Sequence, residues 1–213
     1  MHKEKIEEKV FRLKVTLVDS KPSIWRVLDI VDSETFFDLH VAIQGVMGWE
    51  NSHLHCFVLG KPSDRKNTIR IGMKFDEEID DESELDEDLE VLSEYVNFFA
   101  KKQVEYQYDF GDNWVHKIEL KEIRAKEKGV EYPRCVDGRM ACPPDDCGGI
   151  YGYYEILEDY GNKASDAHDV AVEVLGEGFD PKYFSVDDVD FANILNTYDE
   201  EDDDWDEDED EAM

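Results

Sequence analysis

Residues 134–149 constrain the fold of this chain more than any other segment. They read Arg-Cys-Val-Asp-Gly-Arg-Met-Ala-Cys-Pro-Pro-Asp-Asp-Cys-Gly-Gly and hold three cysteines, two prolines and three glycines in sixteen residues. Proline removes backbone donors and glycine adopts angles that other residues avoid, so neither a helix nor a strand is expected there. Such a loop takes its shape from its neighbours, and ordered loops are where functional groups gather.

Two acidic runs carry most of the net charge of −32. Residues 76–90 hold eleven acids and residues 199–211 hold twelve, without a base in either run. The remaining chain has 32 acids against 23 bases and is only moderately acidic. We predict a mobile acidic insertion at residues 76–88 and a disordered tail at 199–213, because neither buries enough apolar area to offset its ordering entropy. The alternative is an acidic arm that competes for a basic partner or mimics nucleic acid.

The chain shows no sign of a secretory leader or a membrane span. Its first residues lack an apolar core, and no run reaches the roughly 18 apolar residues that a span requires. We expect a cytoplasmic protein that does not associate with a membrane. Its cysteines, Cys56, Cys135, Cys142 and Cys147, are then expected to be reduced thiols.

The hydrophobic pattern predicts one α+β domain over residues 1–198. We expect a mixed, mainly antiparallel sheet packed against helices, and a helical C-terminal third. The expected strands are residues 10–18, 24–30, 54–59 and 69–73, followed by a hairpin over 104–120 with its turn at 110–113. The expected helices are a first one capped by Asp32 or Ser33 and ended by Gly48, and others near 89–99, 151–159, 166–175 and 187–197, the last capped by Ser185.

Four segments resemble the plasmid pRiA4b ORF-3-like family, over residues 9–197. They are Trp49-Glu-Asn-Ser-His-Leu-His-Cys-Phe57, Tyr106-Gln-Tyr-Asp-Phe-Gly-Asp-Asn-Trp-Val-His116, Ala141-Cys-Pro-Pro-Asp-Asp-Cys-Gly-Gly-Ile-Tyr-Gly-Tyr153 and Phe179-Asp-Pro-Lys-Tyr-Phe184. Two positions depart from the family pattern: Asp145 stands where glutamate is usual, and Val174 where an aromatic residue is common. The resemblance implies an α+β domain often encoded on plasmids and mobile elements, sometimes labelled resolvase-like, and it brings no established catalytic residues.

The histidines and cysteines offer a possible metal site. His53 and His55 are two residues apart on an expected strand, so both rings would project from one face, and His116, Asp109, Asp112 or Cys147 could complete a ligand set. The spacing of Cys135, Cys142 and Cys147 is not that of a zinc knuckle, which pairs cysteines two to four residues apart. We favour structural histidines, with His116 buried and hydrogen-bonded, and packing thiols. We therefore expect no cofactor, with zinc or another divalent metal as the alternative.

Four aspartates, Asp109, Asp112, Asp145 and Asp146, lie in or beside turns. Clustered carboxylates bind a hard cation or raise one another's pKa if the loop folds over the hairpin. We favour the local interpretation, in which each satisfies backbone groups of its own turn or cap.

The leading functional hypothesis is a non-enzymatic binding or adaptor module for an unknown protein or small ligand. Its surface would be the cleft between the hairpin turn and the 133–149 loop, formed by Tyr108, Asp109, Phe110, Asp112, Trp114, Asp145, Asp146, Gly148 and Gly149. One alternative is a metal-dependent hydrolase or nuclease built on His53, His55, His116 and nearby aspartates. Another is a DNA-recombination accessory factor, although nucleic-acid binding is not expected because the core lacks a basic face.

Overall fold

The computed structural model describes residues 8–61, 64, 67–74 and 84–191. In this part of the chain eight strands form one sheet in the order β5-β4-β3-β6-β7-β1-β2-β8. The strands are β1 (Lys9–Leu17), β2 (Trp25–Val31), β3 (His55–Leu59), β4 (Ile69–Gly72), β5 (Glu84–Asp86), β6 (Val104–Tyr108), β7 (Trp114–Ala125) and β8 (Arg134–Arg139). The predicted single α+β domain with a mixed, mainly antiparallel sheet is confirmed, and only the β4–β5 pair is parallel.

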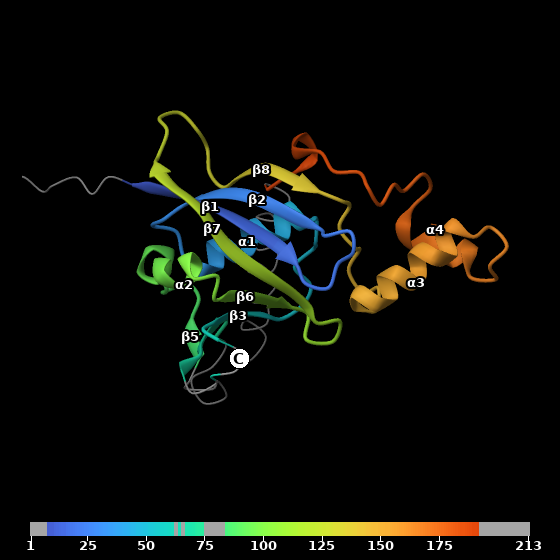
Figure 1. The fold of residues 1–213 in the computed structure, drawn as a ribbon, viewed down its shortest axis with the longest axis horizontal. Coiled ribbons are helices and arrows are strands. Elements are labelled where there is room, and N and C mark those ends of the chain that lie inside the picture. Colours follow the sequence, from blue (N-terminus) through green and yellow to red (C-terminus); the bar gives the residue numbers. More distant parts are fainter. Residues whose placement is uncertain (1–7, 62–63, 65–66, 75–83, 192–213) are drawn as a thin grey trace, which may run out of the picture.

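The alternating pattern of the first strand decides which face of the sheet is buried. Phe11, Leu13 and Val15 of β1 are buried, whereas Arg12 and Lys14 point to the other face. The helix α1 (Phe36–Met47) covers the buried face (Figure 1). The predicted internal position of β3 is also confirmed, because it pairs with β4 on one side and β6 on the other.

Helix α1 begins later than the sequence suggested. Its N-cap is Thr35, not Asp32 or Ser33, and Thr35 and Asp38 form a capping box in which each side chain accepts the other's backbone N–H. The Thr35 side chain thereby satisfies a free N–H of the first turn, which explains why the helix starts there. Gly48 ends the helix at φ 79°, as predicted.

The remaining helices are shorter than predicted in two places. Instead of one helix over 89–99, a 3-10 turn η2 (Leu92–Tyr95) leads into the short α2 (Val96–Ala100), and Leu89 is exposed. The helices α3 (Gly149–Gly161) and α4 (His168–Leu175) agree with the prediction. Ser185 caps only the 3-10 turn η3 (Val186–Asp188), and residues 189–191 are not helical, while 192–197 lie outside the described residues. Among the described residues, no helix combines the length and apolar character needed to cross a membrane.

Part of the acidic insertion is ordered, which corrects the prediction for residues 84–88. Strand β5 pairs with β4, and the side chain of Glu87 is buried against His55, with Oε2 2.7 Å from Nε2. A buried, charge-assisted partner gives this one glutamate a structural role that its acidic neighbours hide in the sequence. Residues 75–83 and the predicted tail at 199–213 lie outside the described residues.

The 134–149 segment is not a loop throughout. Residues 134–139 form the edge strand β8, paired with β2, and Gly138 sits where a side chain would collide with the Phe184 ring. Edge strands tolerate such a composition because only one side must be paired. The irregular part is therefore residues 140–148, which run from β8 to α3 at the end of the sheet where the β1–β2 and β6–β7 turns also lie (Figure 1).

Candidate functional site

The turn between β6 and β7 is held in an unusual backbone conformation. Asp109 and Asn113 adopt φ values of 52° and 56°, in the left-handed region that aspartate and asparagine tolerate best. Asp109 Oδ1 accepts the Gly111 N–H at 2.8 Å, and the Asn113 N–H donates to the Asp109 carbonyl at 2.6 Å. The local turn role predicted for Asp109 is confirmed.

Trp49 connects the irregular loop to the core. The residue follows the Gly48 cap of α1, and its indole N–H donates to the Pro143 carbonyl at 2.9 Å. Its ring stacks on Tyr108 with centroids 5.0 Å apart and lies 5.7 Å from Trp114. The Pro-Pro loop is therefore docked onto a buried aromatic cluster, which holds the acids that follow it.

Asp112 joins the hairpin turn to the helix α3. Its Oδ2 accepts the Gly148 N–H at 2.9 Å, across 36 residues of sequence. Gly148 and Gly149 both have positive φ values, 83° and 67°, as expected for at least one of them. A Cβ on Gly149 would lie 2.5 Å from the Asp112 carbonyl oxygen, so this glycine permits the close approach of turn and helix.

Replacing Gly149 with alanine is expected to destabilise the fold more than replacing Gly148. Both changes force alanine into a left-handed backbone, which costs about 1–2 kcal/mol. Only Gly149→Ala adds a clash with backbone, since a Cβ on Gly148 meets nothing closer than 3.6 Å. We expect a loss of about 3 kcal/mol for Gly149→Ala against about 1 kcal/mol for Gly148→Ala in urea denaturation. Equal losses would mean that the close contact with Asp112 has no energetic consequence.

Three of the four aspartates accept from or face residues far away in the sequence, which corrects the local interpretation for them. Asp112 caps the distant Gly148, as described above. Asp145 Oδ2 accepts the Glu50 N–H at 3.2 Å, and its Oδ1 is buried without a hydrogen bond. Asp146 is exposed, with Oδ1 3.1 Å from His53 Nε2. Burial raises the pKa of Asp145, and the negative charge of Asp146 adds to this effect.

The three histidines of the predicted metal site do not meet. His53 precedes β3 and faces Asp109 and Asp146, whereas His55 lies within the strand and bonds to Glu87. His116 is fully buried beside Trp49, as expected, and its ring lies against the backbone of Tyr106 and Trp114. Irregular backbone before β3 breaks the alternation that would have placed His53 and His55 on one face.

A buried polar network that the sequence did not reveal lies behind this surface. The His40 ring stacks on His55 at 3.4 Å, and its two nitrogens lie 2.7 Å from the Tyr106 hydroxyl and from Asn51 Oδ1. Burial lowers the pKa of His40 well below its usual value, and the neighbouring His55 adds to this effect. The sequence signal was weak, since His40 falls on the apolar stripe of a helix and looks like any core position.

The cysteines are free thiols, as predicted. Burial raises the pKa of Cys142 and of Cys147 to about 12 and also raises that of Cys135. Within the described residues no cysteine belongs to a group with metal-ligand spacing. Protonated, buried thiols are poor nucleophiles and poor ligands, so packing is the role that the structure supports for them.

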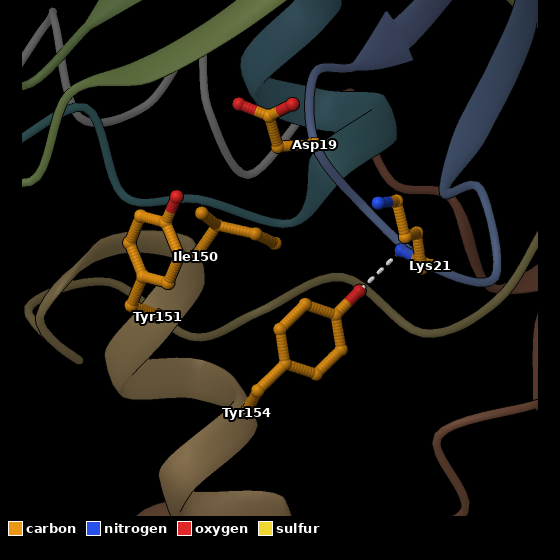
Figure 2. A pocket seen from close by; sticks show the side chains of 5 residues that line it. All are labelled: Asp19, Lys21, Ile150, Tyr151 and Tyr154. Carbon is orange, nitrogen blue, oxygen red and sulfur yellow. Dashed lines mark hydrogen bonds between the residues drawn. The ribbon is translucent and has the colours of Figure 1, made fainter.

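A groove runs between the hairpin turn, the β1–β2 turn and the first turns of α3. One part has a volume of about 340 Å³ and is lined by Asp19, Asp112, Trp114, Gly149 and Tyr151 among others. The adjoining part, of about 320 Å³, is lined by Asp19, Lys21, Ile150, Tyr151 and Tyr154. Figure 2 shows the rings of Tyr151 and Tyr154 rising from α3 toward the turn that carries Asp19, and the Lys21 backbone N–H donating to the Tyr154 hydroxyl at 2.5 Å.

The groove coincides only partly with the predicted cleft. Asp112, Trp114, Gly148 and Gly149 line it. Tyr108 ends β6, and its hydroxyl lies 3.5 Å from Asp145 Oδ2 of the docked loop. Asp109 and Asp146 face His53. Phe110 is exposed at the tip of the turn. Asp19 and Tyr151 could not be predicted as neighbours from the sequence, because the β1–β2 turn and the helix α3 meet only in the folded chain.

An α+β domain with this hairpin and Cys-Pro-Gly loop is a known class of protein. The sequence matches the family described as "Plasmid pRiA4b ORF-3-like protein" over residues 9–188, and the chain belongs to this family. The crystal structure of MM3350, a protein of unknown function from Methanosarcina mazei Go1, has a similar fold, with a TM-score of 0.76 and 38% identity over 86% of this chain and 99% of that one. The uncharacterized protein y4hQ of Sinorhizobium fredii is 34% identical over 167 residues, which cover 78% of this chain and 81% of the relative.

Proposed function

We propose that this protein is a binding module whose groove receives a positively charged segment of a partner protein. The observation that carries the proposal is the groove between the two turns and α3, where ordered acids stand beside an exposed aromatic ring. Tyr151 is 78% exposed, so burial in the core does not account for its place on α3. An exposed tyrosine next to a cleft is typical of recognition surfaces, since it offers a large rigid face and a hydroxyl at little entropic cost.

The charge of the groove favours a cationic occupant. Asp19 and Asp112 line it, and the whole chain carries a net charge of −32. Lys21 lines only one of its two parts, and its backbone is already engaged by Tyr154. An arginine or lysine of the partner would gain both a carboxylate and the Tyr151 ring face, while the overall field would raise its rate of association.

The alternative of a metal-dependent hydrolase or nuclease loses its original ligand set. His55 is occupied by Glu87 and His116 lies in an aromatic cluster, so only His53 remains near the loop acids. The accessory-factor alternative needs a basic face for DNA, and the acidic groove offers the opposite charge.

The proposal is tested with the full chain and a display library of short random peptides. We expect selection at physiological ionic strength to enrich peptides containing arginine or lysine. Combining Tyr151→Ala with Asp19→Asn should weaken their binding by about tenfold or more, because truncating a central aromatic contact costs at least the 1.4 kcal/mol that this factor represents. Anisotropy of a labelled selected peptide measures the change.

The matched control places the same two substitutions elsewhere on the surface. Tyr183→Ala with Asp187→Asn removes an exposed tyrosine and an exposed acid near η3, outside the groove. This control should bind as the native chain does. Equal weakening in both double variants would show that the peptides respond to overall charge, and the groove proposal would fail.

A further inference from the structure

Three ligand-type side chains from separate segments converge beside the hairpin turn. His53 Nε2, Asp109 Oδ2 and Asp146 Oδ1 all lie within 4.8 Å of one another, and they form the one such group among the described residues. The imidazole nitrogen lies 3.1 Å from Asp146 Oδ1 and 3.9 Å from Asp109 Oδ2. Two ligand atoms on one metal ion lie about 3.0–3.5 Å apart when each bond is about 2.1 Å long, so small side-chain movements would complete the geometry.

Ordinary fold requirements do not account for this arrangement. Asp109 is only 9% exposed, its Oδ1 accepts the Gly111 N–H, and its Oδ2 lies on the side of His53, 3.9 Å from Nε2. His53 Nε2 is likewise shielded from solvent and makes no hydrogen bond, although Asp146 is close. Unsatisfied buried acceptors are costly, and a cation placed between them would remove that cost.

The surrounding charge also favours a cation. Asp145 lies beside the group, and its buried Oδ1 has no hydrogen bond. Three carboxylates are thus held around one imidazole, within a loop fixed by the Trp49 bond to Pro143. Like charges at this density repel one another unless a proton or a metal ion is shared between them.

We propose that His53, Asp109 and Asp146 form a binding site for a divalent transition-metal ion such as Zn²⁺ or Mn²⁺. One imidazole with two carboxylates suits these ions better than Mg²⁺ or Ca²⁺, which prefer oxygen ligands alone. Three protein ligands leave coordination positions open, and the 75% exposed Asp146 side chain places them toward solvent. None of the three residues lines the groove, so the site does not depend on the groove being occupied.

Calorimetric titration of the metal-stripped full chain with ZnCl₂ and with MnCl₂ tests the site. We expect one ion per chain at the tightest site for at least one metal. His53→Ala and Asp146→Asn should each weaken it by more than about a hundredfold, since losing even a residue behind a ligand costs about 10–100-fold. His168→Ala, which removes another partly buried histidine, is the control and should leave the affinity unchanged.

A second measurement separates this site from weak binding to the acidic runs. Bound Mn²⁺ broadens nearby NMR signals, so the resonances of His53, Asp109 and Asp146 should disappear at the lowest additions of MnCl₂. Unchanged affinity in both ligand variants would overturn the proposal. So would broadening confined to residues 199–211 with no tight zinc site, and so would the absence of binding by either metal. None of these outcomes bears on the peptide groove, which is tested by Tyr151 and Asp19.

Discussion

Replacing Asp29 with alanine is expected to destabilise this protein by about 3 kcal/mol, because the change leaves three partly exposed arginines without the buried carboxylate that they share. Asp29 lies on β2 with no exposed surface. Its carboxylate accepts two hydrogen bonds from Arg12, at 2.8 and 3.0 Å, and one from Arg134 at 3.1 Å, and it also pairs with Arg124. The cross-strand register places Arg12 of β1 and Arg134 of β8 directly opposite Asp29. Because Arg124 lies on β7, one carboxylate connects four strands.

The control for this prediction is a carboxylate that meets one of the same arginines at the rim. Glu122 lies 3.6 Å from Arg12 and is about half exposed, so Glu122→Gln should cost no more than about 1 kcal/mol. Guanidinium chloride denaturation of both variants measures the difference. If Asp29→Ala lowers the free energy of unfolding by less than about 1 kcal/mol, water solvates the arginines in the variant and the cluster contributes little to stability.

Asp29 also sets how this cluster responds to acid. Burial by itself would raise the pKa of Asp29, but the hydrogen bonds from Arg12 and Arg134 and the charge of Arg124 lower it below its usual value. The contribution of Asp29 to stability is therefore complete above the usual carboxyl pKa. It declines only as the pH falls from that value toward the lowered pKa of the folded state. The cluster should remain intact throughout the mildly acidic range.

The sequence predicted the elements whose signals are local. Strict alternation in residues 10–18 and 104–120 and the three-to-four spacing after residue 35 each depend on neighbours within one element, and the structure has those elements. The N-cap of α1 was predictable from the same information, because Thr35 and Asp38 have the spacing of a capping box. It was missed because Asp32 and Ser33 are also good capping residues.

The features that could not be predicted depend on strand register. Asp29 looks like a polar residue on a half-exposed strand until the register sets it against Arg12 and Arg134. Glu87 resembles its acidic neighbours until β5 pairs with β4 and brings it to His55. The candidate site was predicted in outline, since the hairpin turn and the loop do meet. The pairings within it were not, because they join residues 36 to 95 positions apart.

Acid should destabilise the protein well before its carboxylates are protonated, because two buried histidines, His40 and His116, have lowered pKa values. Burial lowers the pKa of His116 to about 3, and the positive charge of Arg26 contributes to the shift. A histidine in the unfolded chain titrates near pH 6.5. Between the two pKa values this histidine is therefore protonated in the unfolded chain and neutral in the folded chain. Stability is then complete above about pH 6.5 and falls by about 1.4 kcal/mol for each pH unit below it, reaching a loss of about 3 kcal/mol near pH 4.5 from this residue alone.

His116→Phe keeps a ring of similar size within the aromatic cluster and removes the proton. Its free energy of unfolding, measured by urea denaturation, should fall less steeply between about pH 6.5 and about pH 4.5, by about 1.4 kcal/mol per pH unit relative to the native chain. His168→Ala removes a histidine outside the core and should keep the native slope. Parallel curves for the native chain and His116→Phe would contradict the prediction.

NMR titration of the native chain decides the matter if the variant does not fold, because a His116 ring proton that shifts near pH 6.5 would mean that the imidazole is accessible to solvent. A ring that stays neutral down to about pH 4.5 would identify this buried histidine as a source of the acid sensitivity.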